Sequence, residues 1–268
     1  MPRIALNLAT IKPFPLGRKL QVARDAGYQG VGLWLAELEQ VLAGGAKLSD
    51  LTTVLGHLGL RVSELCSVGG WMLTEGKQHE AALEQARQAF RVAEFLGADC
   101  VVATPALGEG SLAEAQVDFA ELCRAAQPFG CRVGLEFAGQ SECVADLATA
   151  WQVVAGADMT NGGLVIDSFH FYQGRSVARE MINLPVDRIF LVQMSDCIDL
   201  PREELRDRDR VFPGMGAIPL PELVGALHNL GYQGWWSLEL HNEQYWQTDP
   251  FIVAQDGWHA LRRLDVAR

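Results

Sequence analysis

The chain has 268 residues, of which 49% are hydrophobic and 21% charged. A chain of this length can bury a sizeable core without disulfides. Its formal net charge of −11 argues against a protein that binds nucleic acid, because such proteins normally present a basic surface to the phosphates. No stretch approaches the apolar length of a membrane span and the apolar run near the N-terminus is too short for a signal peptide, so we expect no membrane association and a cytoplasmic protein.

One pattern recurs along the chain: a helical stretch ends at a glycine, and an apolar run typical of a buried strand follows. Glycine suits this place because the residue that follows a helix often adopts the left-handed conformation, which a Cβ disfavours. The pattern occurs around Gly27, Gly59, Gly97, Gly130 and Gly231. Its repetition indicates consecutive αβ units.

The predicted strands, in chain order, cover residues 3–9, 31–35, 61–68, 100–105, 132–137, 163–168, 189–196 and 234–240. Helical periodicity fills the intervals; Leu83, Ala86 and Phe90, for example, fall on one helical face. Eight strands that alternate with helices favour the α/β class and a closed (β/α)₈ barrel, the TIM barrel, built as a single domain from residues 1–268. A doubly wound open sheet is the alternative.

Four of the later predicted strands end in side chains that can bind a metal ion. In a closed barrel the C-terminal ends of all strands meet at one mouth. Those ends carry Glu136, Asp167, Gln193 and Glu239. Three carboxylates that converge in apolar surroundings repel one another, and a divalent cation relieves this repulsion. Pairing of each carboxylate with an arginine or a helix N-terminus is the alternative, but four such positions on consecutive strands favour the metal.

The donor set also bears on the identity of the ion. Three carboxylates and one amide favour a hard or borderline ion over a tetrahedral structural zinc. We therefore expect one divalent metal ion, Mn²⁺, Mg²⁺ or Co²⁺, with zinc as a further candidate. Four protein ligands on an octahedral ion leave two positions for a hydroxy-carbonyl substrate.

These residues lie in motifs that resemble one family. The motifs are Gly134-Leu135-Glu136-Phe137, Asp167-Ser168-Phe169-His170, Gln193-Met194-Ser195-Asp196, Phe212-Pro213-Gly214-Met215-Gly216 and Ser237-Leu238-Glu239-Leu240. In this order, and over nearly the whole chain, they resemble the xylose isomerase-like barrel superfamily of sugar isomerases, epimerases and related lyases. The resemblance implies that Glu136, Asp167, Gln193 and Glu239 ligate the metal and that the two glutamates transfer protons.

Two positions depart from the branches of that superfamily. The epimerase branch usually has His where this chain has Gln193, and Gln at that position resembles the 3-dehydroshikimate dehydratase branch. The dehydratase branch is expected to carry His two residues after the glutamate of the fifth strand, where this chain has Ala138. Neither branch is matched at both positions.

The leading hypothesis is a metal-dependent isomerase or epimerase that acts on a small sugar or another polyhydroxy carbonyl compound. Glu136 or Glu239 removes the proton next to a carbonyl held by the metal, and the other glutamate returns one. A metal-dependent lyase of the 3-dehydroshikimate dehydratase type is the alternative, and a non-catalytic binding barrel is the third hypothesis. The oligomeric state stays open, a homo-oligomer included.

Two histidines near the mouth are further candidates. His170 lies three residues after Asp167, a spacing that puts the two on opposite faces of an extended strand. It reaches the site, where the resemblance implies substrate contact and a hydrogen bond to the shifting oxygen, only if the strand ends near residue 168 or 169; otherwise it is a loop histidine. His241, two residues after Glu239, is either a partner that orients Glu239 or a surface residue.

Four residues are candidates for substrate contact. Arg208 and Arg210 lie in the loop after the seventh strand, where one of them binds a substrate oxygen or both pair with neighbouring aspartates. Glu64 lies in the middle of the third strand and either lines the mouth or pairs internally. Trp34 lies near the end of the predicted second strand and either shields the pocket from water or packs against its neighbours.

Overall fold

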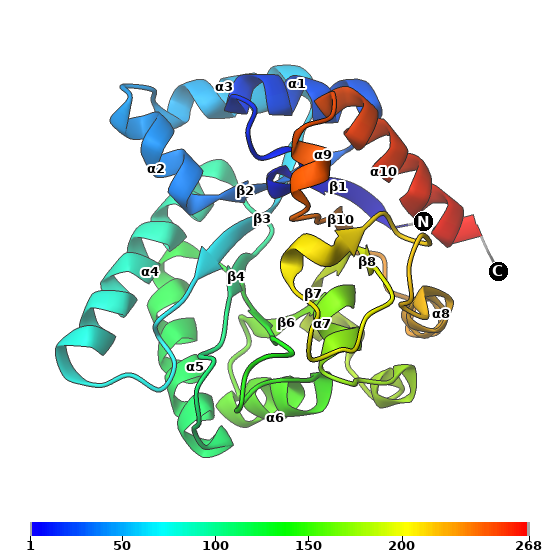
Figure 1. Ribbon diagram of the computed structural model, residues 1–268. Helices are drawn as coiled ribbons and strands as arrows, with labels where there is room; N and C mark the ends of the chain where they lie inside the picture. Colours follow the sequence, from blue (N-terminus) through cyan, green and yellow to red (C-terminus); the bar gives the residue numbers. More distant parts are fainter. Residues whose placement is uncertain (1, 267–268) are drawn as a thin grey trace.

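The computed structural model describes residues 2–266, and within them eight parallel strands close into a barrel. The last barrel strand along the chain pairs with the first, so the sheet has no free edge (Figure 1). In their order around the barrel the strands are β1 (Arg3–Asn7), β10 (Trp235–Leu238), β7 (Ile189–Met194), β6 (Gly162–Asp167), β5 (Val133–Glu136), β4 (Val101–Ala103), β3 (Arg61–Val68) and β2 (Gly30–Trp34). The predicted (β/α)₈ barrel is confirmed, and the open sheet is excluded.

Most of the helices form a ring outside the strands, and the short helices α7 and α9 lie inside this ring in the view of Figure 1. The helices are α1 (Leu16–Ala26), α2 (Leu35–Ala43), α3 (Leu48–Leu58), α4 (Gly76–Leu96), α5 (Leu112–Ala126), α6 (Leu147–Ala157), α7 (Ser168–Gln173), α8 (Leu220–Asn229), α9 (Glu243–Trp246) and α10 (Pro250–Val266). The predicted face of α4 is buried, as Leu83, Ala86 and Phe90 show. Gly27 and Gly59 end α1 and α3 with φ of 98° and 65°, the left-handed conformation expected after a helix.

Most of the barrel strands end one or two residues earlier than the sequence predicts, β4 and β7 among them. The pairing of β4 stops after Thr104, whose amide still donates to the carbonyl of Val68, because the next residue, Pro105, has no amide hydrogen. β7 ends at Met194, and the chain then forms a short antiparallel pair between β8 (Asp196–Cys197) and β9 (Arg210–Val211). This pair carries the loop residues 196–211 back to the C-terminal mouth.

Asp196 organises the loop that follows β7. Its carboxylate accepts hydrogen bonds from the backbone N–H groups of Cys197, Gly214, Gly216 and Ile218, at 2.9, 3.0, 2.9 and 2.9 Å. The side chain of Asp196 is buried, and its bonds to Cys197 and Ile218 are shielded from water, whereas Gly214 and Gly216 are exposed. One aspartate thus holds the Phe212–Gly216 motif beside the end of β7.

We expect Asp196→Ala to lower the free energy of unfolding by about 3 kcal/mol, because four backbone N–H groups, those of buried Cys197 and Ile218 among them, lose their carboxylate acceptor. Urea denaturation followed by circular dichroism measures the change. Asp199→Ala, at an exposed position three residues away, is the matched control and should lie within about 0.5 kcal/mol of the wild type. Equal losses in the two variants would show that the carboxylate of Asp196 does not hold the loop.

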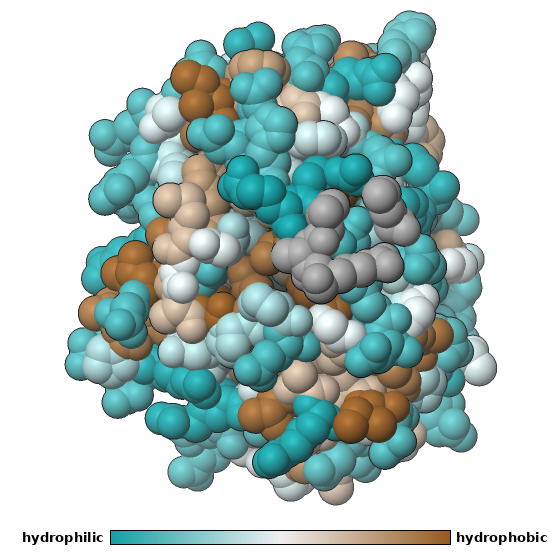
Figure 2. Space-filling view, turned by 90° about the vertical axis from the view of Figure 1, so that its right-hand side faces the viewer, coloured by the Kyte–Doolittle hydropathy of each residue, from teal (hydrophilic) through white to brown (hydrophobic). Residues whose placement is uncertain are grey.

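The surface over α8 and α10 is mostly hydrophilic, with apolar side chains in separate groups (Figure 2). Within residues 2–266, none of the helices is both long enough and apolar enough to span a bilayer. The buried apolar side chains lie inside the barrel and in the layer between strands and helices. Trp71, Phe90 and Phe119 are among the largest of them.

Candidate metal centre

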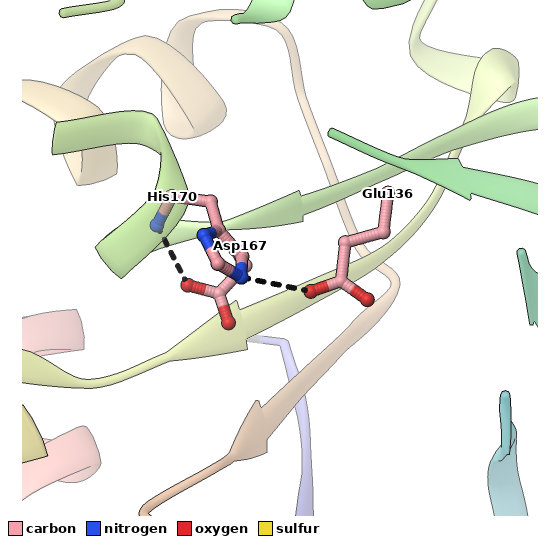
Figure 3. A group of neighbouring side chains, drawn as sticks. All are labelled: Glu136, Asp167 and His170. Carbon is pink, nitrogen blue, oxygen red and sulfur yellow. Dashed lines mark hydrogen bonds and ion pairs between the residues drawn. The ribbon is translucent and has the colours of Figure 1, made fainter. Parts of the chain in front are cut away.

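Three side chains from neighbouring barrel units turn toward one another at the C-terminal mouth (Figure 3). Glu136 ends β5, Asp167 ends β6, and His170 lies in the first turn of α7. One potential ligand atom from each lies within 4.8 Å of the others, and His170 Nε2 is 3.7 Å from Glu136 Oε1. β6 ends at Asp167, so the condition for His170 to reach the site is met. The histidine lies beside the two carboxylates.

Asp167 is buried and accepts hydrogen bonds through both of its carboxylate oxygens. Its Oδ1 accepts the backbone N–H groups of Phe169 and His170, at 2.6 and 3.1 Å, and its Oδ2 accepts Nη1 of Arg210 at 2.6 Å. Burial alone would raise the pKa of Asp167, but the charge of Arg210 and these hydrogen bonds hold it below its ordinary value. The aspartate is therefore kept ionised inside the barrel.

Arg210 supplies a positive charge to the centre. Its side chain is only 2% exposed, and its guanidinium also contacts Asp207 Oδ1 at 3.2 Å and lies 4.0 Å from Glu239 Oε2. Burial would lower the pKa of Arg210, but the surrounding carboxylates raise it. Arg208, in contrast, is exposed in the turn Asp207–Asp209. The structure thus brings Arg210 into the site, as the partner of Asp167, and leaves Arg208 at the surface.

Glu239 directly follows β10 and is buried. Its Oε1 accepts a hydrogen bond from Asn7 Nδ2 at 2.9 Å and lies 3.5 Å from His241 Nε2. The contact predicted between His241 and Glu239 is therefore present. Asn7 was not identified in the sequence; the signal for it was a polar residue that interrupts the apolar run Ile4–Leu8 at the end of the first strand.

Gln193 presents a buried amide to the same mouth. It pairs in register with Asp167 on one side and with Ser237 on the other, and its exposed fraction is 0%. Within residues 2–266 neither Oε1 nor Nε2 of Gln193 has a hydrogen-bond partner. A buried amide without partners is unfavourable, so its atoms are available to a ligand.

The electrostatics of the mouth suit a divalent cation. Burial raises the pKa of Glu136 well above its ordinary value, and the charges of Glu239 and Asp167 raise it further. Burial also lowers the pKa of His170, which favours the neutral imidazole that a metal needs. Carboxylate, imidazole and amide donors are all ligands of divalent metals, and the unpartnered amide of Gln193 fits this interpretation.

Glu64 pairs with side chains inside the barrel and is not placed for substrate contact. Glu64 lies inside the barrel, and its Oε1 accepts Ser237 Oγ at 2.6 Å and Asn7 Nδ2 at 3.3 Å, while its Oε2 accepts the hydroxyl of Ser63. Of the two interpretations that the sequence left open, internal pairing is the one observed. The carboxylate is enclosed and hydrogen-bonded on both oxygens.

Trp34 lines a cavity of about 320 Å³ beside the mouth, together with His241, Lys12 and Lys19. Its ring meets that of His241 edge to face, with centroids 5.6 Å apart. Its Nε1 donates to Asn7 Oδ1 at 2.7 Å, a bond that the sequence did not predict. Trp34 therefore forms a wall next to the site and also orients Asn7.

Comparison with known proteins finds relatives among isomerases and dehydratases. The chain is 34% identical to inosose isomerase of Halalkalibacterium halodurans over 162 residues, which cover 58% of this chain and 57% of that protein. It is 31% identical to 3-dehydroshikimate dehydratase of Pseudomonas aeruginosa over 260 residues, 93% of this chain but 40% of that protein. The chain thus spans about half the length of these curated relatives.

The fold also matches solved structures. The crystal structure of IolI protein with a bound zinc atom superposes with a TM-score of 0.93 over 98% of each chain, at 24% sequence identity. The sequence profile of the xylose isomerase-like TIM barrel family matches residues 20–263. The protein belongs to the xylose isomerase-like TIM barrel family.

Proposed function

We propose that this protein is a divalent-metal-dependent isomerase or epimerase of a small polyhydroxy carbonyl compound. One observation carries the proposal: Glu136 and Glu239 reach the mouth from β5 and from the end of β10, with the β6 and β7 donors between them. Two carboxylates on either side of a bound substrate are what a proton transfer between two carbons or two faces requires. The likeness to inosose isomerases supports the same reaction class.

We infer that the metal is held by four side chains, those of Glu136, Asp167, Gln193 and Glu239, and that His170 lies beside them. Mn²⁺, Mg²⁺ and Co²⁺ suit the oxygen donors, and the zinc of the IolI structure adds zinc to the candidates. The chemistry that such an ion supplies is polarisation of the substrate carbonyl.

The protein's own residues carry the proton. In the proposed reaction one of Glu136 and Glu239 takes the proton from the carbon next to the carbonyl, and the other delivers a proton to the opposite face or to the neighbouring carbon. His170, 3.7 Å from Glu136, donates a hydrogen bond to the substrate oxygen. Arg210 keeps Asp167 ionised and in place through the 2.6 Å ion pair.

A lyase of the 3-dehydroshikimate dehydratase type is the second candidate. Gln193, in place of the histidine of the epimerase branch, and the match of 93% of the chain to the Pseudomonas enzyme favour it. Ala138 argues against it, because the dehydratase branch is expected to have a histidine there. Both reactions begin with removal of a proton next to a carbonyl, so the same glutamates serve either one.

Two assays on the Mn²⁺-loaded protein distinguish these reactions. We expect an inosose or ketose panel incubated in D₂O to gain deuterium on the carbon next to the carbonyl, detected by NMR and mass spectrometry. A dehydratase would instead convert 3-dehydroshikimate to an aromatic product with a new ultraviolet absorbance. Protein stripped with a chelator is the control and should be inactive in both assays.

Each outcome has a definite meaning. Deuterium exchange without an aromatic product supports the isomerase. An aromatic product without exchange contradicts the isomerase and supports the lyase. If the metal-loaded protein is inert in both assays, the proposed enzymatic function is contradicted in favour of a binding role. Equal activity of stripped and loaded protein would contradict the metal requirement.

A further inference from the structure

Glu64 is a carboxylate built into the interior of the barrel. It lies on β3 opposite Gly32 of β2, and a Cβ at Gly32 would collide with the Glu64 carboxylate. Donors surround its head: the hydroxyls of Ser63 and Ser237 and the amide of Asn7. The absence of a side chain at Gly32 leaves space for the carboxylate of Glu64, and the two hydroxyl groups supply hydrogen-bond donors to it.

A carboxylate in this position is unfavourable for stability. Burial raises the pKa of Glu64 to about 7, although its hydrogen bonds lower it in part. An apolar side chain would fill the same space without the desolvation penalty of a charge. A buried titratable group beside a candidate site that none of the proposed steps uses is therefore a candidate for a supporting role.

Asn7 links Glu64 to the metal centre. Its Oδ1 accepts the backbone N–H of Ala9 at 3.0 Å and the indole N–H of Trp34 at 2.7 Å, so its Nδ2 must point the other way. There Nδ2 donates to Glu64 Oε1 at 3.3 Å and to Glu239 Oε1 at 2.9 Å. Nδ2 also lies 3.6 Å from Sγ of Cys66, but a thiol sulfur is a weaker acceptor than a carboxylate oxygen, so we assign the two amide hydrogens to the two carboxylates.

We propose that Glu64 is a positioning residue that acts through Asn7 to hold the carboxylate of Glu239 in the orientation required at the mouth. Glu64 accepts the second hydrogen of the Asn7 amide, and this bond fixes the direction of the first toward Glu239. Partners of this kind orient metal ligands and influence metal affinity as strongly as activity. The inference rests on the proposed function in one respect, that Glu239 is a metal ligand and proton-transfer group.

The test compares two neutral substitutions in the full-length chain. Glu64→Gln keeps a carbonyl oxygen that accepts from Asn7 and Ser237, whereas Glu64→Met has similar length but no acceptor. Asn7→Ala removes the link, and the double variant Asn7→Ala/Glu64→Met completes a double-mutant cycle. If Glu64→Met does not fold, Glu64→Asp takes its place in the cycle, because it withdraws the acceptor by one methylene.

The first readout is Mn²⁺ affinity of the stripped protein, measured by calorimetric titration. We expect Glu64→Met and Asn7→Ala each to weaken binding about tenfold, and Glu64→Gln to stay within about threefold of the wild type. In the Asn7→Ala background, Glu64→Met should add less than about a twofold change, because its route to Glu239 is already cut. For the substrate found in the assays above, kcat should fall in the same pattern with KM nearly unchanged.

Other patterns overturn the inference. Independent effects of Glu64→Met and Asn7→Ala would mean that Glu64 does not act through Asn7, and equal losses in Glu64→Gln and Glu64→Met would assign the effect to charge. A lower melting temperature with unchanged Mn²⁺ affinity would make the role merely structural. If the wild type binds Mn²⁺ but converts no substrate, the proposed function fails while the affinity cycle still decides on Glu64; if it binds no Mn²⁺, both fail.

Discussion

Glu239→Gln is expected to reduce turnover by about 10³-fold, because an amide cannot accept or deliver the proton that a carboxylate transfers. The fold should persist: the amide oxygen of the substituted side chain takes the place of Oε1 and still accepts from Asn7 Nδ2, which lies 2.9 Å from Glu239 Oε1. Rates in the deuterium-exchange or aromatisation assay, measured with saturating Mn²⁺, give the loss. Glu136→Gln should cause a loss of similar size, because both glutamates are required in the proposed reaction.

The matched control is Glu243→Gln, which makes the same chemical change at an exposed position at the start of α9. It should retain the wild-type rate. Retained turnover in Glu239→Gln, with Mn²⁺ bound and the melting temperature unchanged, would remove Glu239 from the proton transfer. Loss in both Glu239→Gln and Glu243→Gln would point to a general effect of charge on the surface of the mouth.

Arg210→Met is expected to lower the free energy of unfolding by about 3–5 kcal/mol when the protein is free of metal, because removal of one partner leaves a buried carboxylate without its counter-charge. The affected groups are Asp167, at 2.6 Å, and Glu239, at 4.0 Å, and both are buried. A divalent cation replaces the missing positive charge. Mn²⁺ at about 100 times its dissociation constant should therefore restore about 3 kcal/mol.

Urea denaturation in the presence of a chelator and in the presence of MnCl₂ measures both quantities. At one fixed MnCl₂ concentration the stabilisation should be larger in Arg210→Met than in the wild type, where Arg210 already compensates Asp167 and weakens the binding of a cation. Arg208→Met, at an exposed position two residues earlier, should change the stability by no more than about 0.5 kcal/mol. A loss in Arg210→Met that is the same with and without Mn²⁺ would contradict a shared role of arginine and cation.

Much of the fold follows from local patterns. The glycines after α1 and α3, the apolar runs of the strands and the buried face of α4 were predicted at their positions, because each depends on residues a few places apart. Strand ends were less accurate where one residue decides them. Pro105 ends β4 early, and the β8–β9 pair interrupts the predicted continuation of β7.

The candidate site was predicted in part. Glu136, Asp167, Gln193 and Glu239 were selected because parallel strands deliver their C-terminal residues to one mouth, and their metal ligation stays a prediction. Glu64 was left between two interpretations, because alternation along a strand does not distinguish an enclosed interior position from one that lines the mouth. Asn7 was missed, because its role depends on a bond to Glu239, 232 residues away.

The sequence by itself determined the barrel and the kinds of side chain at its mouth, because each strand and helix is predicted from the periodicity of a short segment and the number of strands follows from them. Only the tertiary structure decided which charges meet: that Asp167 is paired with Arg210 rather than left open, that His170 turns toward Glu136, and that one amide joins two carboxylates. These contacts join residues 34 to 232 positions apart. They depend on barrel closure and on the path of the β7–α8 loop, and no local pattern encodes such distances.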